Sequence, residues 1–573
     1  MNVTEKLLNA AQGCSAVAFD VFDTLLKRDV STPAALFALP LFPGDFATRR
    51  RQAERQARAA ANGEITLAQI YASPLLKGEN PQNELDAELA ACTSNPAVME
   101  AARACHARGQ KVYAVSDMYL PASQIETMLR HCGADFLDGV FVSSEYGVQK
   151  RSGGLFRAFL HATGLNPKQV LFVGDDFRAD RLGAALAGIR SVGIPEPKPP
   201  IYTEKGNLSA FVCNRQGSVF YETLGPPVTA FARWVGEQRR RCPQMPLLFL
   251  ARDMELVYRV YRQLCPQDDR CGYLRVSRRS LCPALLAAGQ YVLAADALPR
   301  QELTAGQIAR YCGADIPDNA SQMFSLRQGR TGEVVDFLQT LTVDPEAVER
   351  TLRYLQEQGV GQGTLLVDIG SGGTIQRLLE GLCGVSLQGL YLACDERLDH
   401  SRAQVFLFDG QSAPLTYWAA QPVLEKLISE PCGPTLGYRE ENGRVFPLCG
   451  HASMDPVCTQ AHRDALRFAV DWKHSILYSV PLTAAQAIQP FLRMMQSPRL
   501  ADAVRLGNLI LEDGDSHHAP AARPRRRRTY LFRPGQFWDD LHAARWKVGF
   551  LRRVFRLPLP YDRLYAAWKG GRP

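Results

Sequence analysis

The sequence contains no run of about 18 consecutive apolar residues, the length that an α-helix needs to cross a bilayer. Its first residues, MNVTEKLLNAAQGCSAVAFD, lack a cationic segment followed by a long apolar core, so they do not resemble a secretory leader. We therefore expect a cytoplasmic protein. With 573 residues, of which 46% are hydrophobic, the chain is long enough for roughly three or four domains that each bury a core.

Paired cysteines are also lacking. The fifteen cysteines are scattered singly, and no two of them form a CxxC pair. This odd number and this spacing argue against a disulfide framework and against a structural zinc site. We expect most of these cysteines to be reduced and buried as small hydrophobic side chains.

Excess positive charge is missing from most of the chain, although the formal net charge is +8. Residues 521–573 contain fourteen Lys or Arg and three Asp or Glu, a net charge of +11, so residues 1–520 carry a net charge of −3. Because the body of the protein lacks a basic excess and no known nucleic-acid motif occurs, we do not expect a nucleic-acid partner.

Residues 1–195 alternate short β-rich runs with helical patterns. The β-rich runs are SAVAFDVF, KVYAVSDM, GVFVSS and QVLFVGDD. Such alternation predicts an α/β domain with a parallel sheet. The segment IPEPKPP, residues 194–200, has four prolines in seven positions and cannot continue a helix or a central strand, so we place a domain boundary there.

The remainder of the chain predicts further parts. PLLFLARD, CGYLRVSRR, TLLVDIGSGG and GLYLACDE are strand-like and indicate a second α/β domain at residues 201–445. Residues 446–512 are expected to be mainly helical. Residues 513–528, DGDSHHAPAARPRRRR, are polar and interrupted by proline, so we expect a disordered linker. Residues 529–573 form a basic tail.

Polar residues follow each of the four predicted strands of the first domain. In an open parallel sheet, ligands bind at the carboxyl ends of the strands, where side chains from distant parts of the sequence meet. The sequence therefore predicts one site at this edge of the sheet. Its candidate residues are Asp20, Asp23, Thr24, Ser116, Asp117, Lys150, Asp175, Asp176 and Asp180.

A carboxylate, a hydroxyl, a lysine and an acidic cluster in this chain order resemble the four motifs of the haloacid dehalogenase (HAD) superfamily. FDVFDTLL, SDMYLP, VSSEYGVQKRSGGLF and VGDDFRAD are moreover similar to a HAD subgroup of predicted hydrolases that is associated with glycosyltransferases of bacterial surface-polysaccharide synthesis. The resemblance implies a Rossmannoid sheet and a helical cap at about residues 28–105 that closes over the site. Within the cap, Arg49, Arg50 and Arg51 are expected to form a solvated helix face rather than to contact substrate phosphate.

The resemblance also implies a role for each candidate residue. Asp20 would attack phosphorus and form an aspartyl-phosphate, with Ser116 and Lys150 stabilising the phosphoryl group. Thr24 and Asp117 would contact the substrate, a phosphorylated small molecule or sugar. Mg²⁺ prefers hard oxygen ligands. Its ligands would be Asp20, the main-chain carbonyl of Phe22, Asp175, and Asp176 or Asp180.

One residue departs from the motif of HAD phosphatases. These enzymes carry a second aspartate two positions after the nucleophile, which acts as the general acid, and here that position is Phe22. Loss of a positioned acid costs about 10²- to 10⁴-fold in rate. A catalytically silent HAD-like protein with a binding or regulatory role is therefore an alternative to a slow phosphatase.

The second domain offers a separate candidate site. VDIGSGGTIQ reads as a strand, a turn containing Gly370, Gly372 and Gly373, and a helix start, where backbone N–H groups can bind an anion. Arg252 and Asp253 follow a neighbouring predicted strand and could contact phosphate or sugar. One interpretation is a sugar or nucleotide transferase centred on Asp368; another is a tight turn that needs glycine for its φ angles.

The basic tail has an apolar stripe. Successive apolar residues of the stripe lie 4, 3, 4, 3 and 4 positions apart, which predicts one face of a helix with flanking basic residues. Such a helix suits an anionic membrane surface such as the inner face of the plasma membrane. The alternative is that this face packs on the second domain. The stripe consists of Phe537, Leu541, Ala544, Val548, Leu551 and Phe555.

Overall fold

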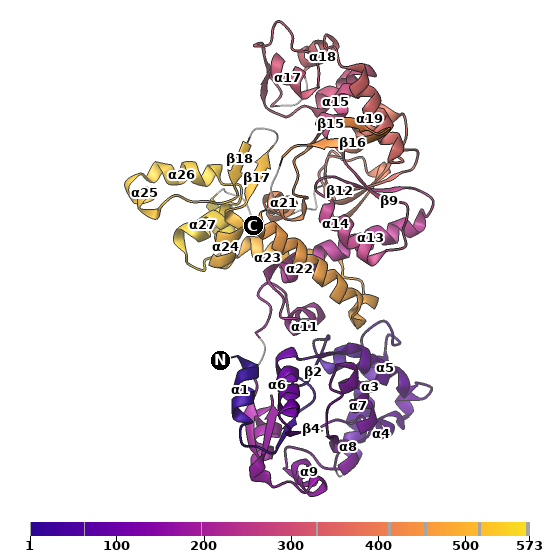
Figure 1. Cartoon of the computed structure of the whole chain (residues 1–573), viewed down its shortest axis with the longest axis vertical. Helices are drawn as coiled ribbons and strands as arrows, with labels where there is room; N and C mark the ends of the chain where they lie inside the picture. The colour runs from indigo at the N-terminus through magenta and orange to yellow at the C-terminus, as the bar shows by residue number, and fades with distance from the viewer. Residues whose placement is uncertain are drawn as a thin grey trace. The chain divides into compact units, whose positions relative to one another are not determined.

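The computed structural model describes residues 2–61, 63–195, 198–327, 331–410, 414–451, 455–513 and 517–568. It divides into two compact units, which are considered separately (Figure 1). The first unit comprises Met1–Gly217 and Trp472–Pro481, and the second comprises Ser218–Asp471 and Leu482–Pro573. Among the residues described, no helix combines the length and the apolar character that crossing a membrane requires.

A five-stranded parallel sheet forms the centre of the first unit, which confirms the predicted α/β class. Its order is β5-β4-β1-β6-β7. The central strands β1 and β6 are buried along their whole length, because helices cover both faces of the sheet. The strands are β1 (Ala16–Phe19), β4 (Lys111–Ser116), β5 (Gly139–Val142), β6 (Val170–Gly174) and β7 (Arg190–Gly193).

Short helices connect these strands. Apolar residues at helical spacing face the sheet, as in α9, where Leu155, Phe156 and Phe159 join Phe172 of β6 in one core cluster. The helices are α1 (Val3–Ala10), α6 (Pro96–Ala107), α7 (Ala122–His131), α8 (Ser143–Tyr146), α9 (Gly154–Thr163), the 3₁₀ turn η2 (Pro167–Gln169), the π-helical turn η3 (Phe177–Leu182) and α10 (Gly183–Leu186).

A helical cap is inserted between the two strands of a short antiparallel hairpin, β2 (Leu26–Arg28) and β3 (Cys92–Ser94). The cap was expected to reach about residue 105, but α6 packs against α1 and β4 of the core, so the insertion ends at β3. The cap helices are α2 (Pro33–Leu36), α3 (Phe46–Ala60), α4 (Leu67–Tyr71), η1 (Pro74–Leu76) and α5 (Pro81–Ala91).

The expectation of a solvated arginine face in the cap is wrong for Arg50. Its side chain is fully buried, and its Nε and a terminal nitrogen donate to Glu84 at 2.6 and 2.7 Å. The hydroxyl of Tyr71 donates to the same carboxylate at 3.0 Å. Arg51 is exposed, as expected. The cap is thus organised around a buried charge pair, which the sequence pattern of α3 does not reveal.

The first unit continues past the proline-rich boundary that we expected at residues 194–200, of which 196 and 197 lie outside the described residues. Helix α11 (Asn207–Asn214) returns to the hairpin, where the Asn214 side chain donates to the Arg28 carbonyl at 2.7 Å. Arg215 then pairs with the buried Asp29. Trp472, which precedes the 3₁₀ turn η6 (Ile476–Ser479), packs on Phe211 with ring centroids 4.8 Å apart.

The second unit also contains a five-stranded parallel sheet, in agreement with the predicted second α/β domain. Its order is β14-β13-β12-β8-β9. Successive strands are therefore added toward one edge of the sheet from β8 to β9 and toward the other edge from β12 to β14, and this order reverses between β8 and β12. Such a reversal opens a crevice at the carboxyl ends of the two strands. The strands are β8 (Leu247–Leu250), β9 (Cys271–Leu274), β12 (Leu365–Ser371), β13 (Gln388–Cys394) and β14 (Ala403–Phe408).

Helices and two small hairpins surround this sheet. Several of them, including α15, α16, α18 and α19, share one large apolar cluster with strands β8 and β9. The elements are α12 (Val219–Thr223), α13 (Gly225–Arg241), α14 (Glu255–Leu264), α15 (Arg278–Ala287), α16 (Tyr291–Ala297), β10 (Glu302–Thr304), α17 (Ala305–Tyr311), β11 (Met323–Ser325), α18 (Gly332–Gln339), α19 (Pro345–Glu357), α20 (Thr374–Cys383), η4 (His400–Arg402), α21 (Leu415–Ile428), β15 (Thr435–Glu441) and β16 (Arg444–Cys449).

The C-terminal segment departs from expectation in two ways. Among the described residues of 513–528, the expected disordered linker, β18 pairs with β17 and α25 begins, because the chain here packs back on the unit. The apolar stripe does not lie on one helix, since α26 ends before Ala544 and α27 begins at Lys547. The elements are α22 (Pro456–Lys473), α23 (Ala484–Gln496), α24 (Leu500–Gly507), β17 (Ile510–Asp513), β18 (His517–Pro520), α25 (Arg527–Phe532), α26 (Pro534–Ala543), α27 (Lys547–Phe555) and α28 (Tyr561–Trp568).

The buried pair in the cap gives a stability prediction. Arg50→Met should lower the free energy of unfolding by about 3–5 kcal/mol, because it leaves the Glu84 carboxylate buried without its cation. Arg50→Met combined with Glu84→Met should recover most of that loss, since no buried charge then remains. Chemical denaturation monitored by circular dichroism measures both values.

Arg51→Met is the matched control on the same helix, and as an exposed substitution it should change stability by no more than about 0.5 kcal/mol. If the double variant were less stable than Arg50→Met, the two side chains would contribute mainly through packing rather than through their charges.

Candidate active site

The carboxyl ends of three adjacent strands bring the predicted residues of the first unit together. Asp20 directly follows β1, and its backbone N–H donates to the Val173 carbonyl of β6 at 2.8 Å. Asp175 directly follows β6, and Ser116 is the buried last residue of β4. Because β4, β1 and β6 are parallel neighbours, all three residues lie at the same edge of the sheet.

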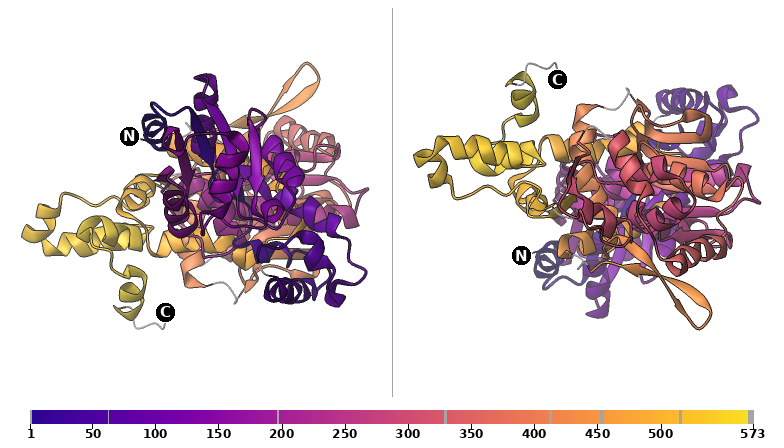
Figure 2. Two further views of the ribbon diagram at one scale, coloured as in Figure 1. Left: turned by 90° about the horizontal axis from the view of Figure 1, so that it is seen from below. Right: turned by 90° about the horizontal axis from the view of Figure 1, so that it is seen from above.

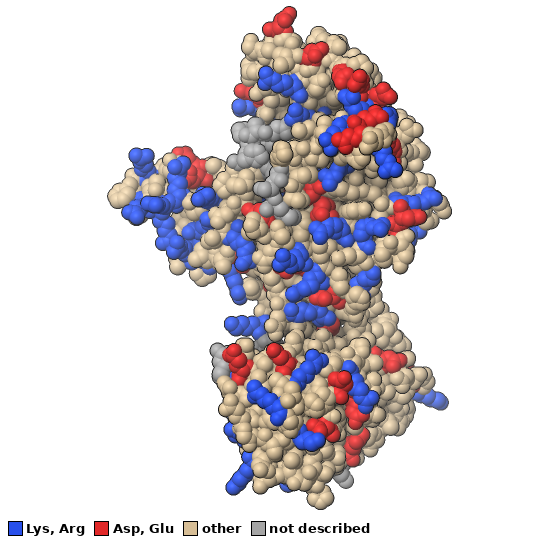
Figure 3. Space-filling view, viewed as in Figure 1, with Lys and Arg blue, Asp and Glu red and all other residues tan. Residues whose placement is uncertain are grey.

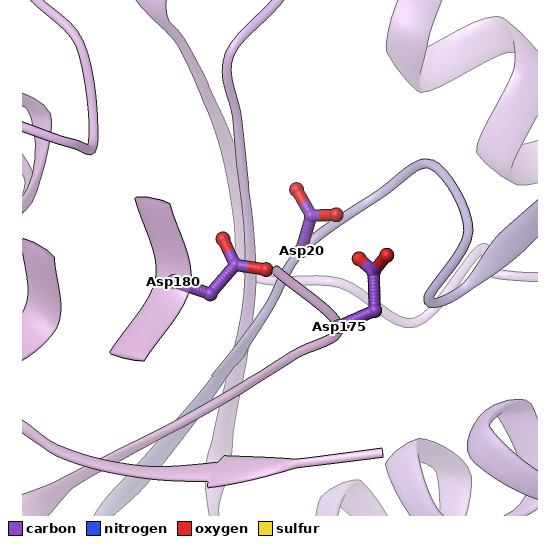
Figure 4. Close-up of side chains that lie close together, drawn as sticks. All are labelled: Asp20, Asp175 and Asp180. Carbon is purple, nitrogen blue, oxygen red and sulfur yellow. The ribbon is translucent and has the colours of Figure 1, made fainter. Parts of the chain in front are cut away.

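Three carboxylates and one ammonium group form the centre of this site. The side chains of Asp20, Asp175 and Asp180 place oxygen atoms within 4.8 Å of one another (Figure 4). The Nζ of Lys150 donates to Asp20 Oδ1 at 2.5 Å and to Asp180 Oδ1 at 2.6 Å. Asp20 and Lys150 are 7% and 3% exposed. The lysine therefore fixes the orientation of two buried carboxylates.

The electrostatics of the cluster leave a surplus of negative charge. Burial raises the pKa of Asp20 to about 7; the nearby Asp180 and Asp175 act in the same direction, and Lys150 opposes them. Burial and Asp180 likewise raise the pKa of Asp175. Burial by itself would lower the pKa of Lys150, but the carboxylates around it outweigh burial and raise it. The lysine is thus a permanent cation that only partly neutralises its neighbours.

The donor set fits a magnesium ion. Carboxylate oxygens are the ligands that Mg²⁺ prefers, and a divalent cation would offset the charge that raises the pKa values of Asp20 and Asp175. The hydroxyl of Thr24 donates to Asp175 Oδ1 at 3.2 Å and orients that carboxylate. Asp180 accepts from Lys150 and from the Asp176 N–H, so it also holds the lysine in place.

Two other predicted residues have positioning contacts. Asp176 Oδ1 accepts from the backbone N–H groups of Arg178 and Ala179, each at 2.7 Å, and so caps the turn η3 instead of joining the three carboxylates. Asp117 Oδ1 accepts from the backbone N–H of Lys150 at 2.8 Å. Asp117 therefore positions the lysine loop.

Phe22, at the position of the expected general acid, is covered by a cation. The guanidinium carbon of Arg28 lies 3.7 Å from the centroid of the Phe22 ring. The Nε of Arg28 donates to the buried Glu88 at 2.8 Å. Arg28 and Glu88 were not among the predicted residues. Their pairing spans 60 positions in the sequence, so no local spacing could have indicated it.

A cavity of about 370 Å³ lies between the cap and the core. The cap side of this cavity comes from α4 and α5, and the core side from residues that follow β4 and β5. None of the predicted site residues of the first unit lines it. The lining includes Thr66, Leu67, Asn80, Leu85, Tyr119 and Glu145.

The predicted residues of the second unit lie at its strand reversal. Arg252 and Asp253 follow β8, and Asp368 lies within β12. Burial, with Asp253 nearby, raises the pKa of Asp368 to about 7. Glu425 of α21, which the sequence did not indicate, joins them, and burial together with Asp253 raises its pKa to about 8. The Ser429 hydroxyl donates to Asp253 Oδ1 at 2.7 Å.

The glycines of the predicted anion loop are explained by backbone geometry. Gly370 has φ +108°, and a Cβ atom there would lie 1.5 Å from the Ala393 carbonyl oxygen. Gly373 has φ +63° at the N-cap of α20, and a Cβ on Gly372 would press on the Arg397 side chain at 3.1 Å. The turn thus needs glycine for its conformation whether or not it binds an anion.

Comparisons with known proteins find similarities in the first unit. Residues 14–188 match the family model described as haloacid dehalogenase-like hydrolase. A HAD phosphatase from Thermococcus onnurineus is similar at 20% identity, covering 33% of this chain and 89% of the other, with a TM-score of 0.26. An L-2-haloacid dehalogenase from Xanthobacter autotrophicus is similar at 19% identity, covering 32% and 77%, with a TM-score of 0.25. The curated proteins searched include no match.

The carboxylate cluster gives a metal-binding prediction. MgCl₂ should raise the thermal unfolding midpoint of the full-length protein, because the ion binds the folded site and not the unfolded chain. Asp175→Asn should abolish most of this rise by removing one anionic ligand. Differential scanning calorimetry with and without the salt measures the effect without any substrate.

Asp176→Asn is the matched control. Asparagine caps a helix as well as aspartate does, so this variant should keep both its midpoint and its response to MgCl₂. An equal loss of the response to MgCl₂ in both variants would show that Asp176 is a ligand of the metal site and does more than cap η3.

Proposed function

We propose that the haloacid dehalogenase-like domain at residues 14–188 is a magnesium-dependent phosphatase that acts through an aspartyl-phosphate on Asp20. The observation that carries this proposal is the buried ammonium group of Lys150, which bridges Asp20 and Asp180 beside Asp175. A structural ion pair would need one carboxylate. The third carboxylate leaves a surplus of negative charge that calls for a cation, and a bound cation would neutralise the charge of a phosphoryl group at the site.

The first step forms the aspartyl-phosphate. Lys150 holds Asp20 through Oδ1, so the carboxylate is already oriented before substrate arrives. A carboxylate oxygen of Asp20 forms a bond to phosphorus while the bond from phosphorus to the leaving oxygen breaks. When bound, Mg²⁺ neutralises charge on the phosphoryl oxygens. Ser116 and the ammonium of Lys150 stabilise the same oxygens.

The second step releases phosphate. A water oxygen forms a bond to phosphorus, the bond from phosphorus to Asp20 breaks, the carboxylate is restored, and both water protons leave with the phosphate. The cap excludes other water from the cleft during the first step. The edge of the sheet at which the four motifs meet can therefore serve both steps, and β1, β4 and β6 need not rearrange.

Phe22 restricts which substrates react well. A hydrocarbon ring cannot protonate the leaving oxygen, and the Arg28 guanidinium stacked on it keeps the ring in place. Substrates whose leaving group is stable as an anion should therefore react faster than alkyl phosphates. The same residue supports the alternative, in which the domain binds a phosphorylated ligand without turning it over.

The leaving-group dependence is the experiment that tests this function. Phe22→Asp should raise turnover of an alkyl phosphate on the order of tenfold or more, because it restores a group that can protonate the leaving oxygen. Turnover of p-nitrophenyl phosphate, whose leaving group needs no proton, should change much less. Steady-state assays of released phosphate compare the two substrates.

Asp20→Asn provides the background for these assays and should reduce both activities to the level of a protein-free blank. If Asp20→Asn retained the wild-type rate, another residue would be the nucleophile. If Phe22→Asp changed both substrates equally, the missing general acid would not be the limit on turnover.

We also propose that the substrate is a phosphorylated sugar or related small molecule of bacterial surface-polysaccharide metabolism, with glycosyltransferases as partners. The similarity of FDVFDTLL, SDMYLP and VGDDFRAD to the HAD subgroup described above supports this proposal. We further propose a cytoplasmic location with peripheral attachment to the inner face of the membrane. The net charge of +11 over residues 521–573 supports that attachment.

A second candidate function belongs to the second unit, as a sugar or nucleotide transferase. Asp253, Asp368 and Glu425 meet at the strand reversal, where ligands bind in open α/β sheets. Burial raises the pKa values of Asp368 and Glu425 to about 7 and about 8, so these two carboxyl groups can take up or release a proton during a reaction. Arg252 stands beside them, paired with Asp253, and is the proposed contact for an anionic substrate.

The raised pKa of Glu425 gives a pH prediction for this cluster. A carboxyl group whose pKa is higher in the folded than in the unfolded state destabilises the fold as pH rises through that interval. Glu425→Gln removes the charge, so it should raise the unfolding midpoint at about pH 8.5 and leave it nearly unchanged at about pH 4. Calorimetry at both pH values measures this difference.

The exposed Glu441→Gln is the control and should shift neither midpoint. If Glu425→Gln lowered the midpoint at the higher pH, the glutamate would be ionised and paired in the folded protein, and it could not serve as an acid near neutral pH.

A further inference from the structure

The C-terminal segment of the second unit presents two apolar side chains to solvent. Leu531 and Phe532, at the end of α25, are 81% and 83% exposed and are the most exposed large apolar residues among those described. Figures 1 and 2 show α25 and α26 at the outer end of this segment, away from the sheet of the unit. Exposure of this size at adjacent positions indicates a contact surface.

Arginines surround this apolar pair. The sequence RPRRRR, residues 523–528, runs directly into α25, and Arg533 follows it. The side chains of Arg526, Arg527, Arg528 and Arg533 are exposed. Figure 3 shows Lys and Arg side chains gathered on this part of the molecule. We name the surface formed by residues 526–533 the arginine tip.

Internal contacts hold the tip against the rest of the segment. Arg525 pairs with Asp540 of α26, and the Tyr530 hydroxyl donates to the same carboxylate at 2.9 Å. The Tyr530 ring packs edge-on against Phe537, with centroids 5.7 Å apart. These contacts use the inner side of α25. Leu531 and Phe532 remain exposed.

Most of the apolar stripe that the sequence predicted for membrane contact packs within the unit. Leu541, Ala544 and Leu551 are buried, and α27 packs against α24. The Trp546 side chain, between the two helices of the stripe, donates to the Met495 carbonyl at 2.9 Å. Most of the stripe therefore anchors the segment to the unit, while Phe555 at its end is 49% exposed.

We propose that the arginine tip docks on an anionic lipid surface, with Leu531 and Phe532 inserted between the headgroups and the arginines at headgroup level. This inference deepens the membrane attachment proposed above by naming the surface that makes it. Two adjacent apolar side chains at the end of α25 suit a bilayer interface. The interior of this interface is disordered and accepts apolar side chains without a groove of matching shape, which a protein partner would need. Arginines at the same level complement lipid phosphates and carboxylates, and their stems can lie along the apolar region.

Vesicle co-sedimentation of the full-length protein tests the proposal. The protein should pellet with phosphatidylcholine vesicles that contain phosphatidylserine and stay in solution with phosphatidylcholine alone. Leu531→Asp with Phe532→Asp should lower the bound fraction at least tenfold at every salt concentration. Replacing Arg526, Arg527 and Arg528 by glutamine should weaken binding at low salt and flatten its salt dependence, because fewer charges contribute.

Leu557→Asp with Leu559→Asp is the matched control. Both leucines are exposed apolar residues of the same segment, at 56% and 42%, but lie outside the arginine tip. This variant should bind vesicles about as well as the wild type. Far-UV circular dichroism and the thermal unfolding midpoint should be equal in all variants and show that they are folded, while vesicle binding is measured independently.

Two results would overturn the proposal. Wild-type binding by the Leu531→Asp, Phe532→Asp variant would show that the apolar pair does not touch the membrane. Release of the protein from vesicles by a single-stranded oligonucleotide at low concentration, with tight binding of that oligonucleotide to the tip, would assign the surface to nucleic acid instead.

Discussion

The ammonium group of Lys150 satisfies two buried carboxylates at once, and the geometry of the first unit follows from that requirement. A buried charge is tolerated only with a partner close by, so Asp20 after β1 and Asp180 in η3 must both reach the lysine. Asp176 caps η3 and thereby places Asp180, while Asp117 holds the backbone of the lysine itself. The residues around the proposed nucleophile thus form one connected network, and the sheet supplies its fixed edge.

The sequence indicated which residues meet at this edge of the sheet because each one is recognisable from its immediate neighbours. Each motif residue directly follows an apolar strand, and parallel strands bring such residues to one edge whatever lies between them. Arg50 and Glu84, or Arg28 stacked on Phe22, could not be predicted in the same way. Their partners lie in other elements of the cap, and an arginine in a helical pattern reads as solvated until its buried partner is known.

The C-terminal segment shows the same limit at a larger scale. An apolar stripe with basic flanks is compatible with a membrane or with the protein's own surface, and spacing alone does not distinguish them. The break between α26 and α27 and the burial of Leu541 and Leu551 assign the stripe to the interior. Leu531 and Phe532 are the most exposed of the large apolar side chains that remain at the surface of this segment.

The central claim is that Asp20 becomes covalently phosphorylated. Intact-mass spectrometry of protein quenched in acid during turnover with Mg²⁺ and a phosphomonoester tests it most directly, followed by fragmentation to locate the modification. We predict an added mass of one phosphoryl group on Asp20 in the wild-type protein and none in Asp20→Asn. Phosphate release at the wild-type rate without such an adduct, or with the adduct on another residue, would contradict the account.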